Sequence, residues 1–239
     1  MKHYLYLLLF FLAACNEIRK EETSIPEAPP PPLFWNDIQN FKKQDSVSFP
    51  PRNAILLIGS SSFTKWTDVQ DYFPGYTIVN RGFGGSTLLD EIFYVNDIVF
   101  PYQPKQIIIY CGENDLASSD TVTAAMVVDR FKHLYKIIRE KTKAQIAYVS
   151  MKPSPSRRHL FAKMREANMA IAIFISDQDP TALIRSNMDP SPARYIDVHW
   201  KMINKAGEPI PEIFLDDSLH MNEKGYAIWK KEIEPYLLK

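Results

Sequence analysis

The sequence predicts an α/β domain built on a parallel, doubly wound sheet of five strands. Short apolar runs, typical of strands buried on both faces, alternate along the chain with segments that space their apolar residues as helices do. The five runs cover residues 54–58, 77–79, 106–110, 145–149 and 195–198. Because strands that alternate with helices are joined by right-handed crossovers, this order favours a sheet in which all strands run parallel.

Two helices are predicted from a capping residue followed by regularly spaced apolar residues. Asp120 is expected to cap the first and Asn222 the last, since short polar side chains accept hydrogen bonds from the free N–H groups of a first turn. The apolar faces carry Val127, Phe131, Leu134 and Ile138 in the first helix and Tyr226, Trp229, Ile233 and Tyr236 in the last. Spacings of three and four residues are typical of helices that cover a sheet.

The length and the charge of the chain favour a single globular domain. The 239 residues are enough for one sizeable α/β domain, which is expected to cover residues 33–239. Lys and Arg together number 28, as do Asp and Glu, so the net charge is zero and does not indicate a nucleic-acid partner. No spacing of His, Cys and Asp in the sequence is typical of a metal site.

Residues 1–14 have the pattern of a secretory signal peptide, with a charged start followed by a short apolar run. The run is shorter than the roughly 20 apolar residues that a membrane-spanning helix needs. Its ending, Leu-Ala-Ala before Cys15, resembles a bacterial lipobox, in which the cysteine is lipidated and becomes the first mature residue. The alternative is an ordinary signal peptide whose cleavage site happens to precede a cysteine. Lipidation of Cys15 would leave Cys111 unpaired, so no structural disulfide is expected.

Residues 15–32 are charged and then proline-rich, and they are predicted to form an extended tether. At about 3.1 Å per residue, such a segment could hold a domain about 50 Å from a membrane. The folded domain is therefore predicted to begin near Leu33. These features together predict a lipid-anchored protein of the bacterial cell envelope, on the periplasmic or the cell-surface side.

Polar and glycine-rich segments follow the first three predicted strands, and a fourth precedes the last helix. These segments are residues 59–62, 80–85, 112–115 and 216–220. In an open parallel sheet, ligands bind beyond the carboxyl ends of the strands. The sequence therefore predicts one site at this edge of the sheet.

The residue types in these segments match the needs of acyl transfer. A serine hydroxyl such as that of Ser61 is a weak nucleophile and requires a base within hydrogen-bond reach. His220 can accept its proton and return it to the leaving alcohol, and Asp217 can hold the imidazole in the right tautomer. The negative oxygen of the tetrahedral intermediate needs donors that are fixed in advance. The candidates are the backbone N–H groups of Ser61 and Gly85 and the side-chain amide of Asn114.

The four segments resemble the four sequence blocks of the SGNH hydrolase superfamily, in the same order, across residues 54–239. The serine block of that family is commonly Gly-Asp-Ser, whereas this chain has Gly59, Ser60 and Ser61. The departure at the middle position is found in a branch of the family in which a tryptophan follows shortly, as Trp66 does here.

The resemblance also assigns roles to residues in the other blocks. The nucleophile of the family maps to Ser61, the block-two glycine to Gly85 and the oxyanion-hole asparagine to Asn114. The last block, Asp-x-x-His, maps to Asp217 and His220. Residues 152–156 are similar to the loop that follows the fourth strand in the same branch. The resemblance implies a flavodoxin-like sheet and an esterase that uses neither a metal nor another cofactor.

Each segment alone has a simpler interpretation. Successive serines are common in turns, and the glycines could permit a tight loop. They are also a near miss for a dinucleotide-binding fingerprint, because Thr87 stands where the third glycine belongs. Glu113 and Asp115 are expected to orient the loop that holds Asn114. These separate interpretations do not explain why all four segments fall at one sheet edge. The chain has no Gly-x-Ser-x-Gly elbow, which argues against an α/β-hydrolase fold.

The favoured function is a serine esterase that removes small acyl groups, acetyl first among them, from a carbohydrate or glycan outside the cytoplasm. Within the same chemistry, the alternative is a lipid or lysophospholipid esterase, because a membrane anchor would place the domain beside such substrates. A second alternative is a non-catalytic glycan-binding lipoprotein on the same fold, since a fold does not determine a function.

Overall fold

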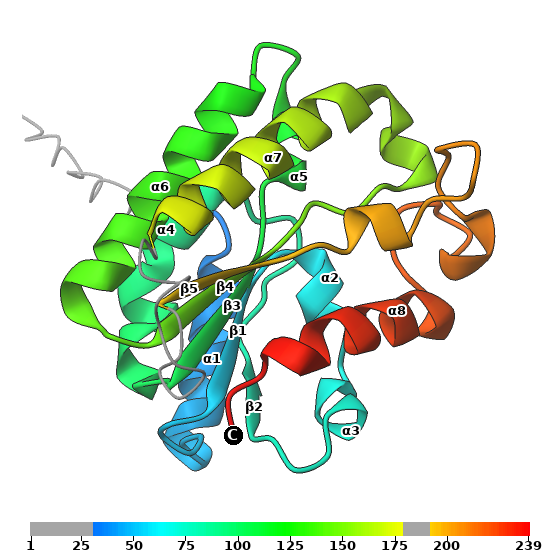
Figure 1. Ribbon diagram of the computed structural model, residues 1–239. Helices are drawn as coiled ribbons and strands as arrows, with labels where there is room; N and C mark the ends of the chain where they lie inside the picture. Colours follow the sequence, from blue (N-terminus) through cyan, green and yellow to red (C-terminus); the bar gives the residue numbers. More distant parts are fainter. Residues whose placement is uncertain (1–30, 179–191) are drawn as a thin grey trace, which may run out of the picture. The chain divides into compact units, whose positions relative to one another are not determined.

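The computed structural model, which describes residues 31–178 and 192–239, contains the predicted sheet of five parallel strands (Figure 1). The strands are β1 (Ile55–Gly59), β2 (Ile78–Asn80), β3 (Gln106–Tyr110), β4 (Gln145–Val149) and β5 (Ala193–Ile196). Their spatial order is β2-β1-β3-β4-β5, and every neighbouring pair is parallel. The predicted α/β class and doubly wound topology are therefore confirmed.

The three central strands are the ones that the sequence shows most clearly. Every residue of β1, β3 and β4 is buried, so each strand reads as a continuous apolar run. In the register between β1 and β3, Ile55 pairs with Gln106 and Gly59 with Tyr110, so both strands end at the same level. The polar segments that follow them consequently lie side by side.

The fifth strand was predicted two residues too late. β5 begins at Ala193 and ends at Ile196, because Asp197 turns the chain away from the sheet. Asp197 Oδ1 accepts the backbone N–H of His199 at 3.0 Å, and the Ser150 hydroxyl accepts the N–H of Val198 at 2.9 Å. These side-chain acceptors replace the carbonyls of a neighbouring strand and start the 3₁₀ helix η3 (His199–Lys201).

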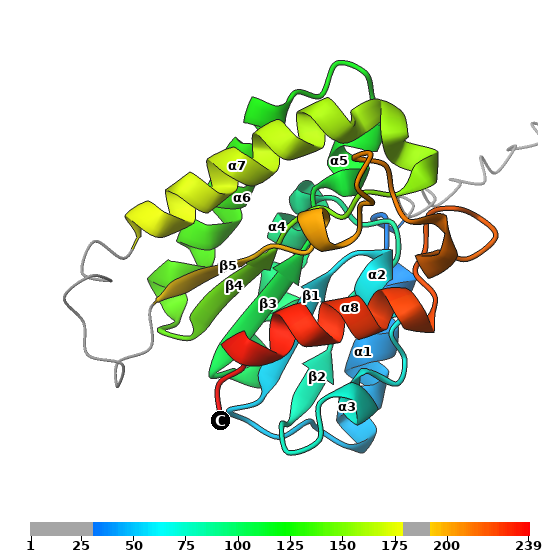
Figure 2. The same cartoon turned by 45° about the vertical axis from the view of Figure 1, so that its right-hand side comes forward.

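Helices cover both faces of the sheet. The α-helices are α1 (Trp35–Val47), α2 (Ser61–Thr64), α3 (Val69–Tyr72), α4 (Leu88–Ile98), α5 (Glu113–Ser118), α6 (Ala124–Lys141), α7 (Phe161–Asp177) and α8 (Glu223–Ile233). Four more 3₁₀ helices are η1 (Phe100–Tyr102), η2 (Pro155–Leu160), η4 (Pro211–Ile213) and η5 (Glu234–Tyr236). α1, α4, α6 and α7 contribute to the core on one face, and α2, α3 and α8 to the core on the other (Figures 1 and 2).

The N-cap of α6 lies three residues after the predicted cap. Thr123, not Asp120, is the N-cap, and its hydroxyl accepts the N–H of Met126 at 3.2 Å. Asp120 belongs to the preceding turn, in which the N–H of Val122 donates to the carbonyl of Ser119 at 3.0 Å. The predicted apolar face of α6 is confirmed, because all four of its residues are buried.

α8 begins as predicted but ends before the last residue assigned to it. The side chain of Asn222 accepts the N–H groups of Lys224 at 3.0 Å and Gly225 at 3.3 Å, which makes it the N-cap. Trp229 and Ile233 are buried. Tyr236 lies beyond the helix in η5 and is exposed, since Pro235 lacks the N–H that would continue the helical ladder.

Leu33 to Lys239 pack into one compact unit. Its first residue is attached by the hydroxyl of Tyr94, which donates to the carbonyl of Leu33 at 2.7 Å. The predicted signal peptide, the predicted lipidation site Cys15 and the tether up to residue 30 lie outside the described residues. Within residues 31–178 and 192–239, no helix is long and apolar enough to cross a membrane.

Candidate active site

Ser61 stands at the end of β1, where the chain turns sharply into α2. Gly59 adopts φ +133°, and a Cβ at this position would overlap the carbonyl oxygen of Tyr110 on the neighbouring strand. Only glycine therefore allows the chain to leave the sheet here. Ser61 is the first residue of α2, so its backbone N–H has no carbonyl partner within the helix and can serve as a donor.

The structure brings Ser61, His220 and Asp217 together in the predicted order. His220 Nε2 lies 3.0 Å from Ser61 Oγ, and His220 Nδ1 lies 2.6 Å from Asp217 Oδ2. The second carboxylate oxygen, Asp217 Oδ1, accepts the backbone N–H groups of Leu219 and His220, both at 2.9 Å. The backbone of residues 217–220 thus fixes the Asp217 carboxylate, and the carboxylate orients the imidazole of His220.

The electrostatics of the pair match this geometry. The hydrogen bond from the His220 side chain, together with backbone N–H donors, holds the pKa of Asp217 below its ordinary value. Asp217 is therefore a carboxylate at neutral pH and accepts the proton of His220 Nδ1. This leaves Nε2 of the neutral ring as an acceptor for the Ser61 hydroxyl proton.

The turn that carries the acid and the base is closed by backbone hydrogen bonds. The N–H of Leu215 donates to the carbonyl of His220, and the N–H of Ser218 to that of Leu215, both at 2.8 Å. The carbonyl of Ser218 also accepts the N–H of Ser156 in η2 at 3.1 Å. The loop after β4 thereby supports the turn from outside.

The loop after β2 places the Gly84–Gly85 peptide beside the nucleophile. A Cβ built on Gly84 would lie 3.8 Å from the Cβ of Ser61, and Gly85 has φ +92°, a conformation that favours glycine. The loop is attached to α2, because Asn80 Nδ2 donates to the carbonyl of Phe63 at 2.7 Å. Gly84 therefore lies within van der Waals contact distance of Ser61, and the predicted donor Gly85 follows it in the same loop.

Asn114 is the second residue of α5 and is half-buried. Its Nδ2 donates one hydrogen to the carbonyl of Ser86 at 3.0 Å. An amide nitrogen carries two hydrogens, so the second remains available for an oxyanion. The three predicted donors, Ser61, Gly85 and Asn114, thus come from the segments that follow β1, β2 and β3.

Glu113 and Asp115, the two neighbours of Asn114 in α5, hold the start of this helix in place, as expected. Glu113 Oε2 accepts hydrogen bonds from Lys152 Nζ at 2.7 Å and from the Tyr110 hydroxyl at 2.6 Å. Asp115 is fully buried and accepts the N–H of Leu88, the first residue of α4, at 2.9 Å. A second contact to Asp115 comes from Arg130 Nη1 of α6 at 2.8 Å.

Sequence reasoning assigned no specific role to Lys152, which is only 2% exposed beneath the site. Its position three residues after the apolar run 145–149 was the signal that could have found it, since residues that follow a parallel strand lie at the carboxyl edge of the sheet. Sequence reasoning also missed Ser86 and Glu91. Ser86 contacts both Glu91 and Asn114, and these contacts depend on tertiary structure alone.

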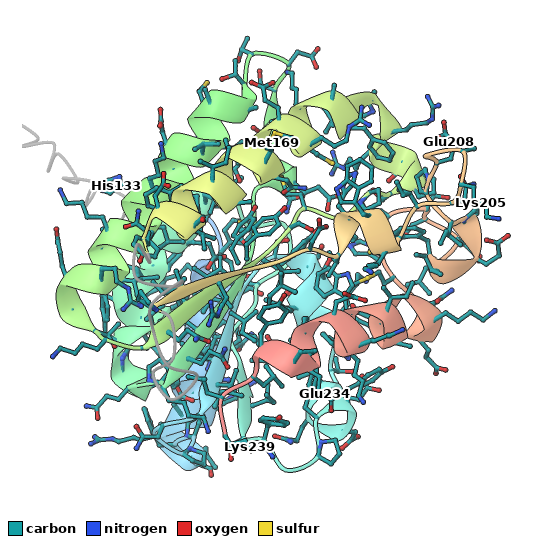
Figure 3. All side chains as sticks on the ribbon, in the orientation of Figure 1. His133, Met169, Lys205, Glu208, Glu234 and Lys239 are labelled. Carbon is teal, nitrogen blue, oxygen red and sulfur yellow. The ribbon has the colours of Figure 1, made fainter. Side chains whose placement is uncertain are left out.

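Among the described residues, the three other histidines and Cys111 take no part in this arrangement. His133 and His159 are exposed, and His133 lies on the outer side of α6 (Figure 3). His199 is buried, its Nδ1 lies 3.0 Å from the carbonyl of Met151, and burial lowers its pKa. Cys111 is buried and unpaired, and burial raises its pKa. Among the described residues, no group of three or more His, Cys, Asp and Glu side chains could hold a metal ion.

A serine with its base, an orienting carboxylate and converging amide donors define a serine hydrolase of the acyl-transfer type. The site lies at the carboxyl edge of a parallel sheet, as the topology requires. A family model described as GDSL-like lipase/acylhydrolase matches residues 58–228. The chain belongs to this family and is an SGNH-type esterase.

Solved structures share this fold at low sequence identity. An inferred acylhydrolase from Bacteroides fragilis has a TM-score of 0.70 at 15% identity, with 84% of this chain and 95% of that chain covered. A GDSL-like lipase from Bacteroides thetaiotaomicron has a TM-score of 0.68 at 15% identity, covering 83% and 95%. A catalytic mutant of an acetylxylan esterase from Geobacillus stearothermophilus has a TM-score of 0.59 at 12% identity, covering 80% and 96%. No curated protein matches the chain.

Proposed function

We propose that this esterase removes small acyl groups, acetyl first among them, from a carbohydrate or glycan outside the cytoplasm. The observation that carries the chemistry is the Ser61–His220–Asp217 arrangement, with 3.0 Å between the nucleophile and its base. The fold shared with an acetylxylan esterase supports acetyl as the acyl group and a polysaccharide as the alcohol.

In the first half of the proposed reaction, Ser61 Oγ attacks the carbonyl carbon of the ester while His220 Nε2 takes the hydroxyl proton. The negative charge moves to the former carbonyl oxygen, where the N–H groups of Ser61 and Gly85 and the amide of Asn114 stabilise it. His220 then gives its proton to the leaving alcohol, and the acyl group remains on Ser61.

In the second half, His220 takes a proton from a water molecule, which attacks the acyl carbon through the same oxyanion site. The bond to Ser61 Oγ breaks, the proton returns to this oxygen, and the carboxylic acid leaves. Asp217 stays ionised throughout and stabilises the positive charge that His220 carries in both halves.

The experiment compares a fragment starting at Leu33, the first residue of the compact unit, with its Ser61→Ala variant on p-nitrophenyl acetate. We expect the variant to be slower by several orders of magnitude. Ser46→Ala, on the exposed face of α1, is the matched control and is expected to retain the activity of the parent. A folded parent no faster than Ser61→Ala would favour the glycan-binding alternative.

The substrate class is tested with the same fragment on p-nitrophenyl esters of increasing chain length and on acetylated xylan. We expect the highest kcat/KM on acetyl esters and release of acetate from the polysaccharide. A preference for long acyl chains would instead support the lipid esterase alternative, in which the membrane supplies the substrate.

The proposal includes a lipid anchor on Cys15 and a place in the cell envelope. It is supported by the apolar leader, the small residues before Cys15 and the proline-rich tether. We expect the full chain, expressed in a bacterium, to partition into the detergent phase, and the Cys15→Ala variant to move to the aqueous phase. Equal partition of both proteins would exclude this anchor.

A further inference from the structure

A carboxylic acid, that of Glu91, lies buried beside the loop between β2 and α4, which carries the predicted oxyanion donor Gly85. Glu91, in the first turn of α4, is 0% exposed, and its Oε1 accepts a hydrogen bond from Ser86 Oγ at 2.8 Å. Its other oxygen, Oε2, has no hydrogen-bond partner in the part of the chain that the structure describes. A charged carboxylate in this environment would be costly, because burial removes its hydration and only one hydrogen bond replaces it.

The groups around Glu91 also disfavour its charged form. Asp90 on the same helix and Asp115 on α5 are both acidic, and the buried thiol of Cys111 faces it from the end of β3. Arg130, a cation of the same cluster, is paired with Asp115 at 2.8 Å. Burial first, and these carboxylates second, raise the pKa of Glu91 to about 8. Glu91 is consequently protonated and neutral at pH 7.

Ser86 connects this neutral acid to two oxyanion donors. It follows Gly85 directly in the chain, and its carbonyl accepts the hydrogen bond from Asn114 Nδ2 at 3.0 Å. The same carbonyl accepts a weaker contact from Cys111 Sγ at 3.5 Å. Because the Ser86 hydroxyl is held by Glu91, the position of this one residue determines how both the Gly85 peptide and the Asn114 amide are presented.

The start of α4 fixes the position from which Glu91 acts. Thr87 and Asp90 form a capping box, with the Thr87 N–H donating to Asp90 Oδ2 at 2.8 Å. The next N–H, from Leu88, donates to Asp115 on the Asn114 loop at 2.9 Å. The helix start is therefore held by its own cap and by α5, and Glu91 reaches back to Ser86 from a rigid base.

We propose that Glu91 is a positioning residue for the oxyanion hole, which acts through its hydrogen bond with Ser86. The inference depends on the proposed acyl-transfer reaction, because only that reaction uses these donors. Donors that are loosely held stabilise the developing negative charge less well than donors fixed in advance. The loss of Glu91 is thus expected to slow the chemical step and to leave ground-state binding of the substrate unchanged.

The test measures steady-state kinetics of the full-length protein on p-nitrophenyl acetate at pH 7. We expect Glu91→Leu to lower kcat about tenfold or more, with KM changed by less than about twofold. Its melting temperature is expected to fall, because the buried Ser86 hydroxyl loses its hydrogen bond to Glu91, so kcat is compared well below the melting temperature of the variant. Glu91→Gln, a neutral side chain that can still accept the Ser86 hydrogen bond, is expected to restore kcat to within about threefold.

Two further readouts separate positioning from a merely structural role. Ser86→Ala is expected to lower kcat by the same factor as Glu91→Leu, because each removes the same Ser86–Glu91 hydrogen bond. The double variant Ser86→Ala/Glu91→Leu is expected to show this factor once, not twice. The wild type is expected to lose kcat as the pH rises through about 8, because the negative charge that Glu91 then carries opposes the developing oxyanion, whereas Glu91→Gln keeps its kcat. The control is Gln106→Leu, which replaces a buried polar side chain at the start of β3, at the end of the strands away from the site. This variant is expected to lower stability without lowering kcat.

The results distinguish failure of this inference from failure of the proposed function. An active parent, an inactive Ser61→Ala variant and an unchanged kcat in Glu91→Leu would overturn the inference and leave the esterase intact. Additive effects of the two single variants, or the same alkaline loss in Glu91→Gln, would also overturn it. An inactive, folded parent would overturn both.

Discussion

His220 Nε2 lies 3.0 Å from Ser61 Oγ although 159 residues separate them in the chain. Ser61 is placed by the sharp exit from β1, and His220 by a closed turn before α8, on the face of the sheet that α2 and α8 share. The two residues meet because α2 and α8 pack against each other, with the Phe63 ring against that of Trp229 and the Tyr226 hydroxyl donating to the carbonyl of Ser62 at 2.9 Å. This contact, rather than any local pattern, makes the serine reactive.

Asp217→Asn is expected to lower kcat by about 10²–10⁴ with little change in the structure of the turn. An asparagine can still accept the backbone N–H groups of Leu219 and His220, but its amide favours the wrong tautomer of the imidazole. The measurement is kcat on p-nitrophenyl acetate beside a circular dichroism spectrum. Full activity in this variant would show that Asp217 does not orient His220.

The contribution of Asp217 to stability is expected to depend on pH in one direction. Its pKa in the folded protein is depressed below the ordinary value of 3.8, so its stabilising effect is fully present above that value. The effect is lost as the pH falls through the lower pKa of the folded state. The difference in unfolding free energy between the wild type and Asp217→Asn should therefore be constant above about pH 5 and shrink below about pH 4. Urea denaturation across this range measures it, and a difference independent of pH would contradict the assignment.

Asn114→Ala is expected to reduce kcat by about 10²–10³ and to leave KM nearly unchanged, because it removes an oxyanion donor. The matched control is Asn96→Ala, at an exposed asparagine of α4 that accepts a hydrogen bond from Lys141 far from the site. The control should retain wild-type kinetics. A rise in KM at constant kcat would instead mean that Asn114 binds the substrate in its ground state.

Gly59→Ala is expected to destabilise the fold by roughly 3 kcal/mol or more, because it combines a positive φ with a steric overlap. The new Cβ would meet the carbonyl oxygen of Tyr110. Gly75→Ala is the matched control: it also has a positive φ, but no atom lies within 4 Å of its Cβ position, so we expect a cost of about 1 kcal/mol. Chemical denaturation compares the two variants, and equal losses would exclude the overlap as the cause.

Lys152→Met is expected to destabilise the protein by about 3 kcal/mol, because it removes the closer cation of the buried carboxylate of Glu113 and leaves Arg157, at 4.0 Å, as the other. The double variant Lys152→Met/Glu113→Gln should recover part of this loss, since it also removes the buried charge. Lys230→Met, which breaks the exposed pair with Glu234, should cost less than about 1 kcal/mol. A double variant less stable than Lys152→Met would contradict this account of the buried pair.

The parts of the fold that could be predicted are those in which burial acts on every residue of a short segment. β1, β3 and β4 are buried on both faces, so their apolar runs appear directly in the sequence. β5 lies at the edge of the sheet and is only partly buried, and its end depends on hydrogen bonds from Asp197 and Ser150. The start of α6 was misplaced for a related reason, because both Asp120 and Thr123 can cap a helix and only packing selects one.

The chemistry of the site could be inferred from the order of its residues, because acyl transfer requires particular residue types that follow buried strands. Ser61, Asn114 and His220 could be named before any distance was known. What holds these residues in place emerged from packing in three dimensions. The contacts of Lys152 with Glu113 and of Glu91 with Ser86 join segments through buried polar atoms, and neither pairing has a local pattern in the chain. Periodicity and spacing report which residues are buried, but the partner of a buried polar group is set by packing between elements that are distant in sequence.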